Sequence, residues 1–350
     1  MPDYQMAGSS PTNEKWSSRR ETGRTGSVNR FTAQAALLGA SICLLAIALS
    51  NCWYLAVPAV ALPAAVDVQP ASPSRPVSRL RESWPRERGK ASVRVMTYNI
   101  HHGADVTGKL DLERIAQVIE DADADIVGLQ EVDRNFGKRS DYQDQPVMLA
   151  ERLKMHYVYG ESLKVYNLGT GRGTGYYGNM ILSRYPISDS SLVRLPTQWG
   201  NEPRTALKAT VESPHGPMTV WVTHLGLSRG ERQAQVGHLL ARLEREPLPS
   251  IILGDFNANA HSSEILAMKE CLGDVASLLR KDQQGTFYTG PNEPMPRIDY
   301  IWVDESFQPV EYQVITGWAS DHLAATADLV VLSEGRGIRA QDGRGELVER

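Results

Sequence analysis

The feature that most constrains the fold is a recurring pattern in which a short apolar run ends in a carboxylate, amide or imidazole side chain. In residues 250–258 the apolar run 251–253 leads through Gly254 to Asp255 and Asn257. An apolar strand that ends in this way presents polar groups at the carboxyl end of a sheet. Taken alone, the segment fits an Asp–Asn turn that closes a core strand equally well.

The pattern is repeated at other strand ends, and the repetition changes its interpretation. A glutamate after a buried run is more often a solvated turn residue, and a histidine after Val-Thr is more often a hydrogen-bonded core or rim residue. A series of strands that all end in such groups is hard to attribute to turns alone. The residues concerned are Asn99, Glu131, His224, Asp255, Asn257 and Asp299, with Asp321 and His322 just before the last predicted strand.

Apolar periodicity predicts many strands joined by short connections, together with about four helices. The strands are expected at 93–98, 125–131, 178–184, 205–212, 218–222, 251–253, 297–303 and 324–332, and the helices at 112–122, 146–153, 229–245 and from residue 263. This set of elements indicates an α+β fold in which two packed sheets have helices outside them.

An apolar segment near the N-terminus predicts a transmembrane helix. No charged residue occurs between Arg30 and Asp67, and residues 35–57 are almost wholly apolar. As a helix with about 1.5 Å per residue the segment spans roughly 34 Å, enough to cross a bilayer. Trp53 and Tyr54 near one end suit an interfacial aromatic belt.

Cleavage of this segment is the alternative to anchoring. Residues 59–61 read Ala-Val-Ala, which resembles a signal-peptide cleavage site, but the apolar run is longer than that of a signal peptide. We therefore favour an uncleaved single-pass anchor over a secreted product, and a buried soluble helix is the least favoured interpretation. More basic residues lie close before the segment than close after it, which favours an extracytoplasmic C-terminal block.

Composition divides the chain into five parts. Residues 1–30 are polar and are expected to form a disordered cytoplasmic tail, and residues 31–66 hold the anchor or signal segment. Residues 67–90 combine Pro, Ser and Arg and are expected to form a stiff linker. Residues 91–332 carry the predicted strands and helices, and residues 333–350 are Gly-rich, charged and expected to be disordered.

The charge of the large block argues against a general nucleic-acid binder. Residues 91–332 contain 22 Lys and Arg against 31 Asp and Glu, a balance of −9. An acidic domain lacks the basic footprint of a tight, non-specific binder, which weakens a nuclease interpretation without excluding it. The three cysteines show no CxxC spacing, so neither a disulfide framework nor a zinc site is indicated.

The polar residues at the strand ends form a chemically coherent set. Glu131, Asp255 and Asp321 offer hard oxygen ligands that suit Mg²⁺ or Mn²⁺ rather than zinc. His224 and His322 can stabilise negative charge that develops on a phosphoryl group. Asn99 and Asn257 can orient ligands or donate to a phosphoryl oxygen, and Asp299 can orient an imidazole ring.

Ordered motifs resemble the endonuclease/exonuclease/phosphatase superfamily over roughly residues 93–331. They are Thr97-Tyr-Asn-Ile-His, Leu129-Gln-Glu-Val, Asn179-Met-Ile-Leu-Ser-Arg, Thr223-His-Leu, Gly254-Asp-Phe-Asn-Ala, Arg297-Ile-Asp-Tyr-Ile and Ser320-Asp-His-Leu. The superfamily includes deoxyribonuclease I, abasic-site endonucleases, neutral sphingomyelinases and inositol-polyphosphate 5-phosphatases. The resemblance implies a four-layer α/β/β/α sandwich, dependence on a divalent metal and hydrolysis of a phosphoester.

The same resemblance implies a role for each matching residue. Glu131 would be the principal metal ligand, with Asp321 beside the metal and Asn99 supporting the metal or the phosphate. Asp255 would position or deprotonate the attacking water, and Asn257 would hold the phosphate.

The two histidines complete the implied machinery. His322, oriented by Asp299, would stabilise the transition state or act as the base. His224 resembles an additional histidine of the deoxyribonuclease and sphingomyelinase branches, which favours a phosphodiesterase. No carboxylate partner for His224 is evident from the sequence.

Other residues are less firmly placed by sequence. Asn179 and Arg204 are expected to face the phosphate, with a surface ion pair as the alternative for Arg204. Residues 101–103 fit a site rim or a turn equally well. Residues 176–177 are expected to line a substrate groove, within a glycine-rich loop at 169–178.

These observations favour a membrane-anchored, Mg²⁺-dependent or Mn²⁺-dependent phosphodiesterase that acts outside the cytoplasm. The anchor and the acidic domain favour a lipid head group or small phosphoester as substrate. An extracytoplasmic nuclease is the first alternative, and a catalytically silent binding module of the same fold is the second. Specificity is expected to lie in the loops at 133–146, 160–178 and 194–204.

Overall fold

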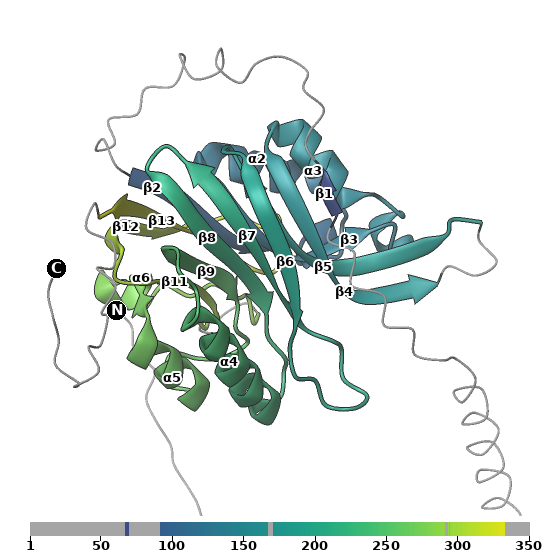
Figure 1. Cartoon of the computed structure of the whole chain (residues 1–350). Coiled ribbons are helices and arrows are strands. Elements are labelled where there is room, and N and C mark those ends of the chain that lie inside the picture. The colour runs from purple at the N-terminus through teal and green to yellow at the C-terminus, as the bar shows by residue number, and fades with distance from the viewer. Residues whose placement is uncertain (1–66, 70–91, 167–170, 291–292, 294, 333–350) are drawn as a thin grey trace, which may run out of the picture. The chain divides into compact units, whose positions relative to one another are not determined.

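The computed structural model describes residues 67–69, 92–166, 171–290, 293 and 295–332, and two mixed β-sheets pack face to face within them (Figure 1). The first sheet has the strand order β1-β4-β5-β3-β2-β13-β12. Its strands are β1 (Asp67–Gln69), β2 (Ser92–Asn99), β3 (Ile126–Arg134), β4 (His156–Tyr166), β5 (Thr174–Ser183), β12 (Phe307–Val314) and β13 (Ala325–Val331).

The second sheet has the order β10-β11-β9-β8-β7-β6. Its strands are β6 (Ile187–Arg194), β7 (Thr205–Ser213), β8 (Gly216–His224), β9 (Ser250–Asp255), β10 (Gly273–Asp274) and β11 (Asp299–Val303). One parallel pair lies inside each sheet, β2 with β3 and β8 with β9, and the other pairs are antiparallel. The predicted α+β sandwich is therefore confirmed.

The main core lies between the sheets, and helices cover both outer faces. The outer face of the first sheet packs on α2 (Leu112–Ala122) and α3 (Gln145–Leu153). The outer face of the second packs on α4 (Arg229–Leu243) and α5 (Ser263–Cys271). Shorter helical segments are η3 (His101–Gly103), η4 (Lys138–Ser140) and α6 (Val275–Leu278).

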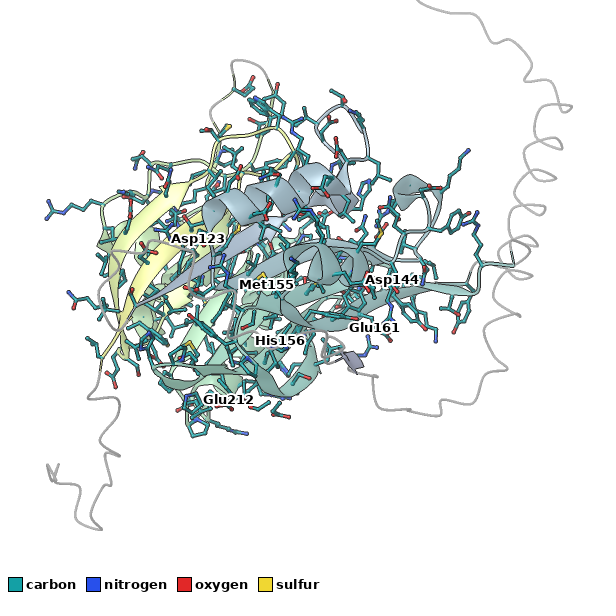
Figure 2. All side chains as sticks on the ribbon, turned by 90° about the horizontal axis from the view of Figure 1, so that it is seen from above. Asp123, Asp144, Met155, His156, Glu161 and Glu212 are labelled. Carbon is teal, nitrogen blue, oxygen red and sulfur yellow. The ribbon has the colours of Figure 1, made fainter. Side chains whose placement is uncertain are left out.

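Side-chain caps fix where the longer helices begin. Asp111 accepts a hydrogen bond from the backbone N of Arg114 at the start of α2, and Asp144 accepts one from Val147 at the start of α3. Such caps satisfy backbone donors that have no partner inside the helix. The left-handed residue Asp123 ends α2, and Figure 2 labels both Asp123 and Asp144 beside the helices that they bound.

The sequence missed five strands, β1, β4, β6, β10 and β12, and the presence of β4 changes one predicted loop. Residues 160–178 were expected to form a specificity loop, but most of them belong to the antiparallel pair β4 and β5. Tyr177 therefore lies in β5 with a side chain that is only 5% exposed, not on a loop. The pairing of these two strands depends on partners distant in sequence, which local periodicity does not reveal.

The predicted tail 1–30, the predicted anchor 31–66 and the predicted tail 333–350 lie outside the described residues. Of the predicted linker 67–90, residues 67–69 form β1, which pairs antiparallel with β4. A free edge of a sheet offers backbone hydrogen bonds to such a segment. In the part of the chain that the structure describes, no helix is long and apolar enough to cross a membrane.

Gly128 in β3 allows the two sheets to approach each other closely. A Cβ atom there would lie 2.6 Å from Cγ2 of Val222 and 2.9 Å from Cβ of Leu253, both in the opposite sheet. We expect Gly128→Ala to lower the free energy of unfolding by about 1–3 kcal/mol, because the packed core must shift. Urea unfolding monitored by circular dichroism measures the change.

Gly237 provides the matched control because it lies exposed in α4, where no described atom within 4 Å would meet an added Cβ. Gly237→Ala should raise the free energy of unfolding by about 0.5–1 kcal/mol, since alanine has the higher helix propensity. Equal urea midpoints for Gly128→Ala and the unaltered protein would contradict the close approach of the sheets.

Candidate active site

The site lies where the apolar inner faces of the sheets give way to polar side chains. Residues two apart in a strand share a face. In β8, Val220 and Val222 belong to the core between the sheets, and His224 continues that row. Asp255 ends the corresponding row of β9, and Asp299 begins that of β11. Because His224 pairs with Asp255 and Asp255 pairs with Asp299, the three residues stand side by side on adjacent strands.

A bulge in β3 turns Glu131 toward the same region. Leu129 and Val132 both pack in the outer core, although they are three residues apart. The two residues between them, Gln130 and Glu131, lie opposite the single residue Asn179 of β5. The backbone of Glu131 takes up the extra residue with φ +60°, a conformation uncommon for a non-glycine residue. Bulges of this kind often redirect a side chain next to a functional site.

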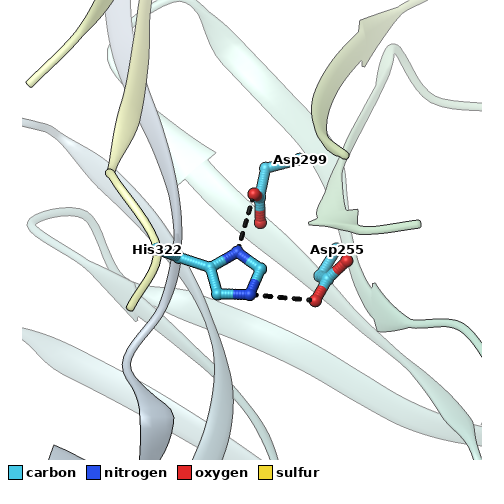
Figure 3. Close-up of side chains that lie close together, drawn as sticks. All are labelled: Asp255, Asp299 and His322. Carbon is cyan, nitrogen blue, oxygen red and sulfur yellow. Dashed lines mark hydrogen bonds and ion pairs between the residues drawn. The ribbon is translucent and has the colours of Figure 1, made fainter. Parts of the chain in front are cut away.

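His322 is held between two carboxylates, as Figure 3 shows. Its Nδ1 is 2.8 Å from Oδ2 of Asp299, and its Nε2 is 3.7 Å from Oδ2 of Asp255. All three side chains are buried. The Asp299 contact fixes the orientation of the ring, so that Nε2 is directed toward Asp255.

Residues outside this cluster hold its members in place. The hydroxyl of Thr286 accepts a hydrogen bond from the backbone N of Asp299 at 3.1 Å. The hydroxyl of Ser320 accepts one from the backbone N of His322 and donates one to the carbonyl of Asn99. The ring of Phe287 packs against that of His322, with centroids 4.7 Å apart.

The amide of Asn99 links the two sheets at the site. Its Nδ2 is 3.0 Å from Oε1 of Glu131 and 3.1 Å from Oδ2 of Asp255. Its Oδ1 accepts a hydrogen bond from the backbone N of His101. Two carboxylates from different sheets therefore converge on one buried amide.

The electrostatics of the cluster favour a protonated His322 next to a carboxyl group that is difficult to ionise. Burial opposes the charge on His322, but the carboxylates of Asp299 and Asp255 raise its pKa to about 10. Burial, together with the nearby Asp299, raises the pKa of Asp255 to about 7. A buried carboxylate in this state is stabilised by any additional positive charge that enters the site.

His224 has a different protonation state from His322. Its Nε2 is 3.0 Å from Nδ2 of Asn257 and 3.4 Å from Oδ2 of Asp255. Burial, and then the charges of Arg204 and His322, hold its pKa well below the usual value. We therefore interpret the Asp255 contact as one of a neutral imidazole rather than an ion pair. Asp255 is the carboxylate neighbour that the sequence did not identify.

Asn257 is held in place by one hydrogen bond to Asp255 and another to the residue that follows β8. Its backbone N donates to Oδ1 of Asp255 at 2.9 Å, and its Nδ2 donates to the carbonyl of Leu225 at 3.0 Å. Its backbone has φ +49°, which asparagine tolerates better than most residues. The predicted pair at the end of β9 is thus a tight turn and also part of the site.

Three other predicted residues lie around this centre. Asn179 donates to the carbonyl of Thr205 at 3.1 Å, and Arg204 forms a 2.8 Å ion pair with Glu202. Asp321 is part-exposed, and its Oδ1 is 3.8 Å from Nδ1 of His101. The roles of Asn179, Arg204 and Asp321 in binding phosphate or metal remain predictions.

The donor atoms of the site fit a hard divalent cation. Ligand atoms of Asp255, Asp299 and His322 lie within 4.8 Å of one another. Oδ1 of Asp299 is buried and has no hydrogen-bond partner among the described residues, although such groups are normally satisfied. The predicted ligand Glu131 is linked to this cluster by Asn99, whose Nδ2 contacts the carboxylates of both Glu131 and Asp255. Carboxylate oxygens are the ligands that Mg²⁺ and Mn²⁺ prefer.

Some residues that shape the site were not identified from sequence as partners. Thr286 and Phe287 lie outside every predicted strand, and Glu202 lies in a loop without periodicity. Ser320 belongs to one of the motifs and lies directly before Asp321 and His322, but no contact was predicted for it. The short Ser-Asp-His spacing could have indicated that the serine hydroxyl accepts a hydrogen bond from the backbone N of the histidine.

Comparisons with known proteins agree on one family. A sequence model of the endonuclease/exonuclease/phosphatase family matches residues 96–322. The uncharacterized protein YbhP of Escherichia coli is 30% identical over 264 residues, which cover 70% of this chain and 99% of YbhP.

Solved structures match the same fold. An endonuclease/exonuclease/phosphatase from Beutenbergia cavernae matches with a TM-score of 0.57 and 27% identity, over 69% of this chain and 72% of that chain. A mannosyl-6-phosphatase from Bacteroides thetaiotaomicron matches with a TM-score of 0.53 and 21% identity, over 68% and 99% of the two chains. The second likeness shows the fold alone.

Proposed function

This chain belongs to the endonuclease/exonuclease/phosphatase family, and we propose that it hydrolyses a phosphoester by metal-assisted in-line attack of water. The observation that carries the proposal is the buried cluster of Asp255, Asp299 and His322 with Glu131 bridged to it by Asn99. Paired acids and a carboxylate-oriented imidazole next to the core between the sheets provide acid–base groups and charge stabilisation at one point.

Glu131 would be the principal residue that holds a divalent cation. Nδ1 of His322 is engaged by Asp299, so a cation bound within that cluster would compete with a 2.8 Å hydrogen bond. Glu131 is less buried, and its carboxylate and that of Asp255 contact the same amide. When bound, Mg²⁺ or Mn²⁺ would polarise a phosphoryl oxygen and offset its negative charge. Asp321 lies near enough to His322 for its charge to raise the pKa of that histidine. We propose Asp321 as a second ligand of the cation.

The protein side chains would supply the rest of the chemistry. Asp255 would orient the attacking water and receive its proton, because its raised pKa suits a general base near neutral pH. Protonated His322 would donate to the phosphoryl oxygen that gains charge. Asn257 and neutral His224 would hold the other phosphoryl oxygens.

We propose a membrane phospholipid head group as the substrate and an extracytoplasmic location for the reaction. The support comes from the apolar segment at 35–57 and from the balance of −9 in residues 91–332. The segment would keep the site near a bilayer, and the acidic balance disfavours a long polyanion such as DNA.

Metal removal and a substrate panel test this function. The full-length protein in detergent is incubated with phospholipid vesicles, an inositol phosphate and plasmid DNA, after EDTA treatment and after addition of Mg²⁺ or Mn²⁺. We expect phosphate-ester release from phospholipid, loss of at least 100-fold in rate with EDTA, and recovery with either metal. Glu131→Gln should reproduce much of the EDTA effect, because it weakens cation binding without changing side-chain size.

Two outcomes would contradict the proposal. Full activity of Glu131→Gln, or activity insensitive to EDTA, would remove the metal-assisted assignment. Rapid cleavage of plasmid DNA without release from phospholipid would replace the lipid substrate by nucleic acid.

A further inference from the structure

The hairpin of β4 and β5 extends past the rest of its sheet and carries basic and tyrosine side chains at its end (Figure 1). Strand β3 accompanies β5 only as far as Tyr176, whereas β4 and β5 continue to pair up to Tyr166 and Thr174. The side chains of Lys164 and Arg172 are exposed, and that of Tyr166 is 67% exposed. Exposed tyrosines are enriched at interfaces, so the end of the hairpin is a candidate contact surface.

The basic groups at this end of the hairpin rest on tyrosine rings. Nζ of Lys164 lies 5.5 Å from the ring centroid of Tyr166 and 5.6 Å from that of Tyr176. Cζ of Arg172 lies 4.3 Å from the ring centroid of Tyr142, which belongs to the turn after η4. We call these five residues, Tyr142, Lys164, Tyr166, Arg172 and Tyr176, the hairpin surface.

Contacts with aromatic rings leave the positive charges available to an anion. A ring attracts a cation through its quadrupole but does not neutralise it. Within the described residues, Lys164 forms no ion pair with a carboxylate. Residues 162–177 hold two bases and no acid, although the block 91–332 has a balance of −9. This local excess of positive charge favours an anionic partner.

Strand β1 shows from which side the N-terminal part of the chain enters the sheet. The pair of β1 with β4 is antiparallel and sets Asp67 opposite Tyr159, so the chain before Asp67 enters from the side of β4 that leads to Tyr166. Residues 58–66 reach at most about 30 Å, and the path along β4 from Tyr159 to Tyr166 covers roughly 23 Å. The end of the hairpin is thus within reach of a bilayer that the apolar run 35–57 would cross.

The hairpin surface lies at the same end of the first sheet as the candidate active site. Asn179 of β5 lies opposite the bulge at Glu131. Tyr176 is three residues further along β5 toward the end of the hairpin, a distance of about 10 Å. A partner that bound the hairpin surface would therefore lie next to the site.

We propose that the hairpin surface docks on a bilayer that contains anionic phospholipid, with Lys164 and Arg172 on the lipid phosphates and Tyr166 among the head groups. A tyrosine suits this depth because its ring is apolar and its hydroxyl stays in water. Each basic residue near an anionic membrane strengthens binding by about fivefold. The proposal concerns binding alone and goes beyond the proposed hydrolysis.

A nucleic acid would offer the same negative charge as the bilayer, but two observations favour the bilayer. The balance of −9 in residues 91–332 repels a long polyanion. The entry of the chain beside the hairpin brings the apolar run 35–57 to the same side of the sheet.

Hydrogen exchange on the membrane-bound protein tests the docking. The full-length protein is assembled into lipid nanodiscs of phosphatidylcholine, alone or mixed with phosphatidylglycerol, and exchange is followed by mass spectrometry. We expect peptides that cover 160–166 and 171–177 to exchange at least about fivefold more slowly in the anionic discs, because the head groups cover this part of the hairpin. Peptides from the central strand β8 should exchange equally in both discs.

The double variant Lys164→Gln/Arg172→Gln should lose the difference between the two discs, because it removes both charges from the hairpin. Arg242→Gln/Arg245→Gln is the matched control. It removes two exposed bases at the end of α4 that leads into the start of β9, whereas Asp255 lies at the other end of β9. This control should keep the slower exchange in anionic discs. For the unaltered protein, salt at about 1 M should abolish the slowing, since the Debye length falls to about 3 Å.

Several results would overturn the proposal. Equal exchange of the hairpin peptides in the two discs would do so, as would slowing that survives the double variant or failure of the unaltered protein to assemble with either disc. Equal exchange together with oligonucleotide binding that the double variant loses would assign the surface to nucleic acid. Slowing that also occurs in neutral discs and grows with the number of protein molecules per disc would assign it to a second copy of this chain.

Discussion

Asp255→Asn should lower the turnover number for phosphoester hydrolysis by about 10³-fold, within the range for loss of a general base. The substitution keeps the shape of the side chain and removes its ability to accept a proton. Oδ2 of Asp255 is within 3.7 Å of both histidines of the site, and Nδ2 of Asn99 lies 3.1 Å from it. No other described carboxylate makes all three contacts. The initial rate at saturating substrate and Mg²⁺ is the measurement.

The fold should tolerate this change. Burial already disfavours the charge of Asp255, so an uncharged isostere is expected to leave the melting temperature unchanged or higher. Gain of stability with loss of function is a common property of active-site residues. The activity loss can then be assigned to chemistry rather than unfolding.

Asp304→Asn is the matched control at the other end of the same strand pair. Asp304 is also buried, and it accepts hydrogen bonds from the backbone N of Ser250 and of Ser306. We expect this variant to lose some stability and to keep the rate per folded molecule. Activity of Asp255→Asn within threefold of the unaltered protein would show that Asp255 is not the base.

The sequence predicted which residues lie together at the candidate site better than it predicted the sheets. Asp255, His224 and Asp299 were identified because an alternating apolar row makes the polar residue at its end conspicuous. The same rows place these residues on one face, and pairing in register then brings them together. Asn99, which ends β2, reaches Asp255 because the two sheets share one core.

Features that depend on non-local pairing were not predictable. The bulge at Glu131 is defined by the pairing of β3 with Asn179 of β5, which is distant in sequence. The motif Leu129-Gln-Glu-Val alone therefore does not predict it. The loop predicted at 160–178 became a strand pair because β4 is stabilised by β5 rather than by its own periodicity. For Arg204 the sequence predicted a phosphate contact or, as the alternative, a pair with a surface acid. The buried Arg204 and its pair with Glu202 were not predictable, since burial is not visible in a sequence.

Asp274→Ala should lower the free energy of unfolding by about 3–5 kcal/mol, the usual effect of leaving a buried charge without its partner. Asp274 and Arg297 form a two-pronged pair with distances of 3.1 and 2.7 Å, and their side chains are 2% and 3% exposed. The pair also anchors the segment that leads into Asp299, so the cluster at His322 depends on it. Thermal and urea unfolding measure the loss.

The pH dependence of this loss has a definite sign. Burial opposes ionisation, but the hydrogen bonds from Arg297 prevail and hold the pKa of Asp274 below its usual value. A carboxyl group with a lowered pKa contributes stability above its unfolded pKa, about 3.9, and that contribution is lost as the pH falls through the folded pKa. The difference in unfolding free energy between the unaltered protein and Asp274→Ala should therefore be full at pH 6 and shrink below about pH 4.

Asp328→Ala isolates the effect of burial, because Asp328 forms a similar two-pronged pair with Arg94 in which the side chains are 12% and 26% exposed. Water can replace the lost partner there, so a cost of about 1 kcal/mol is expected. Equal losses for the two variants would contradict the role of burial. The double variant Asp274→Leu/Arg297→Met should recover most of the loss of Asp274→Ala, because two apolar side chains leave no charge unpaired. If the double variant remains as unstable as Asp274→Ala, the destabilisation comes from displaced packing around β11 rather than from the uncompensated charge of Arg297.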